Sequence, residues 1–234
     1  MSTRKRKNTA ENGLSEVLAG MLGKHRLFDG LSAEEIAEIV ERIGGGVRRF
    51  AKDEIVVYEG TKAKWIVPVL KGQLAVYESG TSGERHLARV VGEGGLFGAT
   101  MMTANLETYP GMAVANLDCT VAFLEIAKVK AMWREGRHAR FFENLYSTVC
   151  GEVLESWQKL SVLACRKTED RFMLYLRWRA AETGKVELQL PFATSEACAQ
   201  YLGVTRTALS LAVKRLDERG EIKRLGRGRF ALKN

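Results

Sequence analysis

Residues Thr194–Leu216 read TSEACAQYLGVTRTALSLAVKRL, a sequence that predicts two short helices joined by a tight turn. The first helix is expected to begin at Thr194 or Ser195, since either residue can act as its N-cap. Gly203 lies in the turn and can adopt the positive φ that ends a helix. Thr205 follows as the expected N-cap of the second helix. The stretch is therefore a candidate helix-turn-helix motif.

The second helix of this motif has two chemically different faces. One face carries apolar side chains at helical spacing, which we expect to pack inward: Leu209, Ala212, Val213 and Leu216. The opposite face carries side chains that can face a DNA groove: Arg206, Thr207, Ser210, Leu211 and Lys214. This arrangement is typical of a DNA-binding helix-turn-helix. The alternative is an ordinary helical hairpin with a solvated basic face.

A basic β-hairpin is expected after the second helix. Gly220 ends that helix, and two strand candidates, Ile222–Leu225 and Arg229–Leu232, flank a glycine-containing turn. Five cations lie on or beside this hairpin: Lys223, Arg224, Arg227, Arg229 and Lys233. From Pro191 to the end, nine Lys or Arg stand against four Asp or Glu, a balance that suits phosphate contact. The hairpin therefore favours a winged helix-turn-helix.

The composition of the chain fits a nucleic-acid partner. Its 234 residues can form two modest domains, and a formal net charge of +8 with a pI of about 9.4 suggests a polyanionic partner. No apolar run reaches membrane-spanning length and no secretory signal is recognisable, so we expect no membrane association and a cytoplasmic location. Residues 1–20 are expected to be a disordered basic tail, with an auxiliary contact to DNA phosphates as the alternative.

The cysteine and histidine residues give no sign of a metal site or a disulfide framework. The cysteines are widely separated, and we expect them to be small buried side chains in a reducing compartment: Cys119, Cys150, Cys165 and Cys198. His25, His86 and His138 are equally dispersed. A redox-sensing thiol and a haem or metal ligand are the alternatives. We find no nucleophile–base pair and no paired carboxylates, so we expect no catalytic residues and no enzyme.

Between Val47 and Leu124 the pattern changes to short β-rich runs separated by turns. The strand candidates are Ile55–Tyr58, Trp65–Leu70, Leu74–Tyr77, His86–Val91, Met112–Ala115 and Val121–Ile126. Short strands at this spacing favour an antiparallel sandwich or barrel. Pro68 cannot donate a ladder hydrogen bond, so its run is expected at a sheet edge or a bulge. A helix with a capping box at Ser32 and Glu35 is expected before the strands.

A long helix is expected over about His138–Leu163. Seven positions along it alternate four and three residues apart, as in a coiled-coil seam: Phe142, Tyr146, Val149, Val153, Ser156, Leu160 and Leu163. We interpret this stripe as the contact of a parallel homodimer. The alternative is that the stripe packs on the chain's own β domain.

Four short segments resemble motifs of one family of bacterial regulators. Leu70–Val76 is similar to the family's "VKGxVxV" strand pair, and Gly94–Gly98 to its "GDxxG" entry to the phosphate-binding cassette. Phe50–Ile55 resembles its opening β turn, and Lys167–Arg171 resembles the hinge before its DNA-binding domain. These segments, in the order β domain, long helix and winged helix-turn-helix, resemble the CRP/FNR superfamily of transcription regulators over nearly the whole chain.

The resemblance implies an α+β fold with an N-terminal antiparallel β-roll or jelly-roll sensor domain, a dimerisation helix and a C-terminal winged helix-turn-helix domain. The expected boundaries are residues 21–136, 137–165 and 166–234. It also implies a homodimer that binds double-stranded DNA, interacts with RNA polymerase and changes arrangement when an effector binds. The two recognition helices would enter successive major grooves, about 34 Å apart.

The resemblance also assigns roles within the recognition helix. Arg206 matches the family's base-reading arginine and can contact a guanine edge. Thr207 stands where many members have a glutamate that accepts from cytosine, so the half-site is expected to differ from the family's common one. Phosphate or peripheral contacts are expected from Ser195, Thr205, Ser210 and Lys214.

The chain departs from the cyclic-nucleotide-binding members where they hold their ligand. Ala99 replaces a glutamate that binds the ribose hydroxyl, and Tyr109–Gly111 replaces an Arg-Ser/Thr-Ala run that binds the phosphate. Loss of such a charge-assisted contact costs roughly 1.5–3 kcal/mol. We therefore do not expect cyclic AMP to be the effector.

A pocket for a different effector is the resulting hypothesis. Its candidate residues are Gly98, Ala99, Met101, Tyr109, Met112, Ser156 and Trp157. Methionine and aromatic side chains favour an apolar or aromatic small molecule. The alternative is that these side chains fill the space and no ligand binds. A second alternative is a ligand-binding signalling module that binds DNA only weakly. Because no cysteine precedes Cys119, the N-terminal cysteine cluster of the family's iron–sulfur sensors is excluded.

Overall fold

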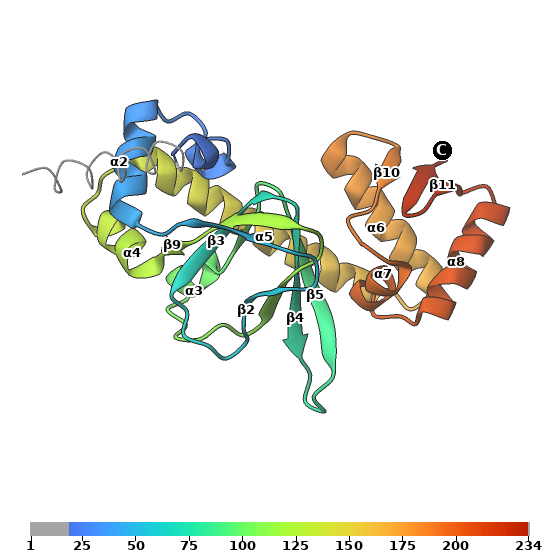
Figure 1. Ribbon diagram of the computed structural model, residues 1–234. Coiled ribbons are helices and arrows are strands. Elements are labelled where there is room, and N and C mark those ends of the chain that lie inside the picture. Colours follow the sequence, from blue (N-terminus) through green and yellow to red (C-terminus); the bar gives the residue numbers. More distant parts are fainter. Residues whose placement is uncertain (1–18, 234) are drawn as a thin grey trace, which may run out of the picture. The chain divides into compact units, whose positions relative to one another are not determined.

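The structure, a computed structural model, describes residues 19–233 (Figure 1). Contacts between Cα atoms divide the chain into two units. Unit 1 comprises Met1–Glu78 and Val91–Cys150, and unit 2 comprises Ser79–Val90 and Gly151–Asn234. The expected basic tail falls almost entirely outside the described residues.

Unit 1 begins with η1 (Arg26–Phe28) and α2 (Ala33–Ile43). The Ser32 hydroxyl accepts a hydrogen bond from the Glu35 N–H at 3.2 Å, and the Glu35 carboxylate accepts one from the Ser32 N–H at 2.8 Å. This reciprocal pair is the predicted capping box, which is confirmed.

Two sheets follow α2. The first has the order β1-β8-β3-β6, with β9 also paired to β3. Its strands are β1 (Val47–Phe50), β3 (Trp65–Lys71), β6 (Leu96–Phe97), β8 (Cys119–Ala122) and β9 (Leu124–Glu125). The second has the order β2-β7-β4-β5, with strands β2 (Ile55–Val57), β4 (Gln73–Ser79), β5 (Arg85–Gly92) and β7 (Met112–Ala115). The strands β1 and β8, β2 and β7, β3 and β8, and β4 and β7 pair antiparallel, as the sequence predicted.

Strand β3 lies inside its sheet. It pairs with β8 and also with β6 and β9, and its middle residues are buried. Of the two positions expected from Pro68, the sheet edge is therefore wrong. The next residue, Val69, donates its N–H to the carbonyl oxygen of Gly95 at 3.0 Å. The register with β8 also shifts between Val69 and Lys71, the kind of irregularity at which proline occurs in sheets.

The predicted strand Val121–Ile126 is divided in the structure. β8 ends before Phe123, β9 begins after it, and Ile126 is already the first residue of a helix, α4 (Ile126–Arg134). The Phe123 N–H donates to the carbonyl oxygen of Gly46 at 3.0 Å. Because the residues from Val121 to Leu124 are all apolar, the sequence contains no sign that the strand is interrupted at Phe123.

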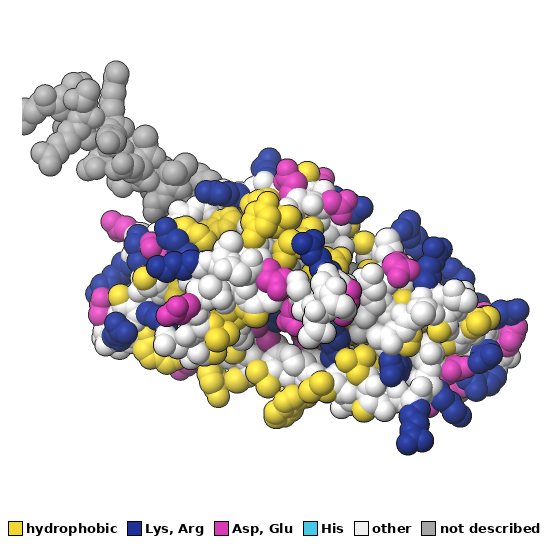
Figure 2. All heavy atoms as spheres, turned by 90° about the horizontal axis from the view of Figure 1, so that it is seen from below, with side chains coloured by type: hydrophobic (Ala, Val, Ile, Leu, Met, Phe, Trp, Pro, Cys, Tyr) yellow, Lys and Arg dark blue, Asp and Glu magenta, His cyan; other side chains and the backbone are white. Residues whose placement is uncertain are grey.

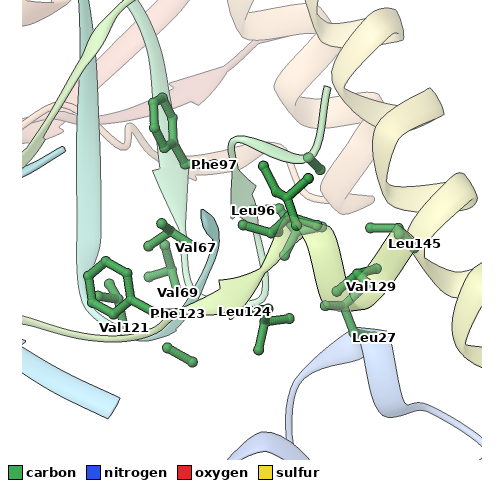
Figure 3. Packing of buried hydrophobic residues seen from close by; sticks show 14 of the residues in the cluster. Leu27, Val67, Val69, Leu96, Phe97, Val121, Phe123, Leu124, Val129 and Leu145 are labelled. Carbon is green, nitrogen blue, oxygen red and sulfur yellow. The ribbon is translucent and has the colours of Figure 1, made fainter. Parts of the chain in front are cut away.

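The buried side chains of unit 1 form one hydrophobic cluster (Figure 3). Leu27 of η1, Val129 of α4 and Leu145 of the long helix α5 (Ala139–Ala164) belong to it. Each of the three is no more than 2% exposed. Burial of these apolar side chains fixes the N-terminal half of α5 to unit 1.

Unit 2 contains the C-terminal helices and a small sheet. The helices are α6 (Thr168–Thr183), α7 (Ser195–Tyr201) and α8 (Arg206–Glu218). The strands are β10 (Glu187–Gln189), β11 (Ile222–Gly226) and β12 (Arg229–Leu232), in the order β10-β12-β11. The rings of Phe172 and Phe230, both buried, meet edge to face with centroids 5.2 Å apart. The predicted α+β fold is confirmed, although α6 and β10 were not predicted.

Candidate nucleic-acid interface

Two threonine caps define the helices of the helix-turn-helix. The hydroxyl oxygens of Thr194 and Thr205 each accept a hydrogen bond from a backbone N–H three residues later, at 3.0 and 3.1 Å. Gly203 has a φ of 63°, the left-handed conformation that the turn requires. Of the two caps considered for the first helix, the structure uses Thr194, because Ser195 is already the first residue of α7.

Burial separates the two faces of α8. Leu209, Ala212 and Leu216 are no more than 5% exposed, and Val213 is half-buried. The opposite side chains are exposed: Arg206, Thr207, Ser210, Leu211 and Lys214. Among the described residues, the Arg206 guanidinium has neither a hydrogen-bond nor an ion-pair partner, so its donors are free for an external acceptor.

A groove of about 570 Å³ lies in unit 2 between α8 and the β11–β12 hairpin. Arg206 and Lys214 line it from α8, and Arg224 and Arg227 line it from the hairpin. Asp217 is the single carboxylate among the lining residues. The groove is therefore concave and strongly basic, a combination that attracts phosphate groups.

Most of the residues predicted to contact DNA meet in this groove. Five of the seven line it: Ser195, Arg206, Ser210, Leu211 and Lys214. Thr205 and Thr207 are exposed at the start of α8 but do not line the groove. Lys and Arg side chains are numerous on the C-terminal part of the chain, at the right of Figure 2.

Two contacts tie the hairpin to the helix-turn-helix, one to the segment before α7 and one to α8. The Arg227 guanidinium donates to the carbonyl oxygen of Ala193 at 3.1 Å. The Asp217 carboxylate accepts from the backbone N–H of Arg224 at 3.3 Å. The one carboxylate of the groove is thus engaged by the hairpin backbone.

Arg171 joins the end of α5 to the turn of the helix-turn-helix. Its guanidinium donates to the carbonyl oxygens of Leu163 and Cys165 at 3.0 and 2.8 Å. It also donates to those of Leu202 and Gly203 at 3.0 and 2.9 Å. The last carbonyl groups of a helix have no partner within it, so this arginine satisfies them. The sequence placed Arg171 in a hinge but did not reveal these contacts, because backbone acceptors leave no sequence signal.

A second polar cluster joins β5 to the C-terminal half of α5. The Arg89 guanidinium lies 2.9 Å from the Glu152 carboxylate. Burial raises the pKa of Glu152, although the charge of Arg89 acts in the opposite direction. The Lys159 ammonium donates to two carbonyl oxygens of β5 at 2.9 and 2.7 Å and lies 4.7 Å from the ring centroid of Tyr201 in α7. Lys159 and Arg171 thus each contact the helix-turn-helix, at Tyr201 and at the turn that contains Gly203.

The cysteines fall into two groups. Cys119 and Cys198 are buried, as predicted, and burial raises the pKa of their thiols to about 11 and about 12. Cys150, on α5, and Cys165, just after its end, are only half-buried, contrary to the prediction. Among the described residues, no three His, Cys, Asp or Glu side chains form a cluster that could hold a metal ion.

The predicted effector-pocket residues of unit 1 are packed into its interior. Four of them are no more than 7% exposed: Ala99, Met101, Tyr109 and Met112. Gly98 precedes the short helix α3 (Ala99–Thr103) with a φ of 82°, and a Cβ added to it would lie 2.7 Å from the carbonyl oxygen of Trp65. The backbone therefore passes close to β3 at the entry to the cassette.

Tyr109 fixes this packing. Its ring stacks on Phe97 with centroids 5.4 Å apart. Its hydroxyl donates to the carbonyl oxygen of Trp65 at 2.7 Å and accepts from the N–H of the same residue at 2.8 Å. Ser156 and Trp157, the other predicted pocket residues, belong to unit 2, where both are exposed on α5.

The residues of the predicted dimer seam have different environments along α5. Phe142 is buried in unit 1, Val149 packs against the same cluster, and Leu163 is half-buried in unit 2. The other four are exposed: Tyr146, Val153, Ser156 and Leu160. The large apolar side chains that α5 exposes are Tyr146, Val153, Leu154, Trp157 and Leu160. Sequence reasoning missed Leu154 in this stripe and assigned Trp157 to the pocket.

Comparisons with known proteins agree with this architecture. The family model of the cyclic nucleotide-binding domain matches residues 47–135. No curated protein sequence matches the chain at a significant level. No helix among residues 19–233 is both long and apolar enough to cross a membrane.

Several solved structures share the fold at low sequence identity. FixK2 from Bradyrhizobium japonicum has a TM-score of 0.67 at 19% identity, covering 82% of this chain and 93% of its own. The c-di-GMP-responsive global regulator CLP from Xanthomonas campestris has a TM-score of 0.66 at 17% identity, covering 85% and 99%. A CRP/FNR family transcriptional regulator from Thermus thermophilus has a TM-score of 0.58 at 20% identity, covering 80% and 93%. Residues 47–135 thus form a domain of the cyclic nucleotide-binding type, and the chain has the fold of the CRP/FNR transcription regulators.

Proposed function

We propose that this protein is a transcription regulator that binds double-stranded DNA sequence-specifically, as a homodimer on an inverted repeat. The basic groove between α8 and the β11–β12 hairpin is the observation that carries the proposal. Duplex DNA presents a negative charge about every 1.7 Å along its axis, so a groove with several cations and one engaged carboxylate complements its backbone. With α8 in the major groove, the hairpin lies beside a phosphate strand.

The exposed side chains of α8 divide into two kinds of contact. Arg206 has free guanidinium donors at the N-terminal end of the helix, where recognition helices approach base edges, so it is assigned to a guanine. Lys214, Arg224 and Arg227 line the groove farther along and are assigned to phosphates. The first contact supplies sequence specificity, and the others supply affinity that depends on salt.

Dimerisation is proposed through the exposed apolar stripe of α5. Tyr146, Val153 and Leu160 are spaced by heptads, and Trp157 lies between the last two at coiled-coil spacing. The four are between 42% and 67% exposed, a large apolar area for a solvated helix. A parallel partner helix would bury this stripe and place two recognition helices on one duplex. In this role the protein would act in the cytoplasm with RNA polymerase as a further partner.

Arginine-to-alanine variants of α8 test the assignment of Arg206. Arg206→Ala is expected to weaken binding to the preferred duplex by roughly 1–3 kcal/mol and to relax one base position. Arg215→Ala is the matched control, because Arg215 lies on the same helix but pairs with Glu169 at 2.9 Å and does not line the groove. Equal losses for Arg206→Ala on preferred and random duplexes would contradict base reading.

A specific observation favours a regulator that works without a ligand in its β domain cassette. The predicted pocket residues of unit 1 are buried, and the Tyr109 hydroxyl both donates a hydrogen bond to Trp65 and accepts one from it. Residues 98–112 contain no Lys or Arg, so a phosphate entering here would lose its water without gaining a cation from this segment. This packing supports the alternative that the side chains fill the space rather than contact an apolar effector.

Thermal unfolding with added nucleotides tests the ligand-free alternative. Cyclic AMP is one probe, and c-di-GMP, to which the Xanthomonas campestris relative responds, is the second. Neither is expected to raise the unfolding temperature of the full chain. A ligand present at 100 times its Kd would stabilise the folded state by about 2.7 kcal/mol, so a clear rise with either nucleotide would contradict the proposal.

A further inference from the structure

Leu211 is an apolar side chain on the surface proposed to meet DNA. It is 50% exposed and lines the basic groove together with Arg206 and Lys214. A single exposed leucine is ordinary on a protein surface. This one is distinctive because the groove that it lines also holds Arg206, Ser210 and Lys214, which are assigned to DNA, beside buried apolar side chains, so complex formation would remove it from water.

We propose that Leu211 reads the 5-methyl group of a thymine in each half-site, an inference that rests on the function proposed above. In the major groove thymine is the base that presents a methyl group, and apolar side chains recognise it by contact. Leucine cannot donate or accept a hydrogen bond, so at any other base edge it would cover polar groups without satisfying them. The residue therefore specifies one base by attraction and disfavours the others.

The position of Leu211 on α8 predicts where the thymine lies. Leu211 follows Arg206 by five residues, which corresponds to a rise of about 7.5 Å along the helix. Successive bases on one strand are about 3.4 Å apart. Since both side chains line the same groove, the thymine is expected within about three base pairs of the guanine that Arg206 contacts.

Replacement of thymine by deoxyuridine tests this contact, because it removes the methyl group and keeps base pairing. The full chain is titrated with its preferred duplex and with duplexes in which each thymine is replaced singly. Burial of one methyl-sized group is worth about 0.8 kcal/mol, or about fourfold in affinity. One thymine in each half-site is therefore expected to weaken binding about fourfold when its methyl group is removed. Leu211→Ala is expected to bind both duplexes equally.

Two control variants make the result specific. Leu117→Ala makes the same chemical change at a side chain that is 47% exposed in unit 1, and it is expected to retain the fourfold effect. Thr207→Ser removes the methyl group one turn before Leu211, and it is also expected to retain the effect. Loss of the effect in Thr207→Ser but not in Leu211→Ala would assign the methyl contact to Thr207 and overturn the inference.

The remaining outcomes separate this inference from the proposed function. A preferred duplex in which no thymine is sensitive to loss of its methyl group, or which holds no thymine, would overturn the role of Leu211 and leave sequence-specific binding intact. If Leu211→Ala still loses about fourfold in affinity when the thymine methyl group is removed, the role of Leu211 is likewise overturned and sequence-specific binding remains. If no duplex is preferred at all, the proposed function and this inference are both wrong.

Discussion

Arg171 and Gly203 are joined by a hydrogen bond of 2.9 Å from the arginine Nη1 to the glycine carbonyl oxygen. The same guanidinium binds the carbonyl oxygens at the end of α5, so one side chain links that helix end to the turn before α8. Any change at this link is expected to alter both the stability of unit 2 and the presentation of its recognition helix.

Substitution of Arg171 by lysine tests the link while keeping the charge. A lysine ammonium cannot bridge both pairs of carbonyl groups, because it is a point donor rather than a planar fork. Arg171→Lys is expected to lower the free energy of unfolding by roughly 2–3 kcal/mol. Urea unfolding followed by circular dichroism measures this change. Arg166→Lys, at an exposed site in the same hinge, is the control and should have little effect.

Gly203→Ala tests the turn itself. Gly203 has a φ of 63°, and an added Cβ would lie 2.9 Å from Cδ2 of Leu163 and 3.2 Å from Nη1 of Arg171. Gly184 has a similar φ of 67° with open space around it, so Gly184→Ala isolates the backbone strain, about 1–2 kcal/mol. Gly203→Ala should destabilise the protein more than Gly184→Ala in thermal unfolding. Equal losses of stability in the two variants would show that Leu163 and Arg171 move aside without destabilising the protein.

The pH dependence of stability is expected to depend on His25. This side chain is 3% exposed; its Nδ1 accepts from the Leu27 N–H at 3.2 Å, and its Nε2 lies 3.2 Å from the carbonyl oxygen of Gly95. Burial lowers the pKa of His25 below 6.5, more than the contact with Gly95 raises it. Protonation of Nδ1 would also remove the acceptor used by Leu27.

The sign of this effect follows from the lowered pKa. Above pH 6.5 His25 is neutral in both the folded and the unfolded chain, so its titration does not reduce the free energy of unfolding. Below pH 6.5 the unfolded chain binds a proton at His25 before the folded chain does. The free energy of unfolding should therefore fall as pH drops below 6.5, by up to about 1.4 kcal/mol per pH unit from this group. Urea unfolding at several pH values measures the slope, which should be smaller in His25→Asn. An unchanged slope in that variant would contradict the assignment.

Leu160→Glu tests the proposed dimer contact. Leu160 is 64% exposed, so the charge should be tolerated by the single chain but not in a seam against a second α5. Sedimentation velocity should then show a species of 26.0 kDa in place of a dimer. Leu106→Glu, at a residue 48% exposed in unit 1, should remain dimeric. If the Leu160→Glu variant remains a dimer, the dimer contact does not involve this part of α5.

The helix-turn-helix could be predicted because its signals are local. The cap at Thr205, the left-handed Gly203 and the alternation of buried and exposed residues on α8 each depend on neighbouring residues. Helix α6 was missed because its buried positions lie in a short continuous apolar run, Phe172–Leu176, which periodicity alone does not assign to a helix or a strand. Local pattern recognises a helix best when its apolar face is continuous.

The environment of α5 could not be predicted from its own sequence. Apolar residues cover more than one side of this helix, so spacing alone did not distinguish Phe142, which packs into the core, from Trp157, which is exposed. The sequence likewise left open whether Pro68 lies at a sheet edge or at a bulge, because the strands that pair with β3 lie far along the chain. In each case a partner distant in sequence decides the outcome.

Selection of random duplexes by the full chain without an effector, followed by sequencing, shows whether the protein recognises a DNA sequence by itself. We expect enrichment of an inverted repeat whose half-site centres lie one helical turn, about 10–10.5 base pairs, apart. That result would establish a sequence-specific dimer with both recognition helices on one face of the duplex. Salt-sensitive binding without enrichment of any sequence would contradict this expectation and reduce the basic groove to a nonspecific phosphate contact.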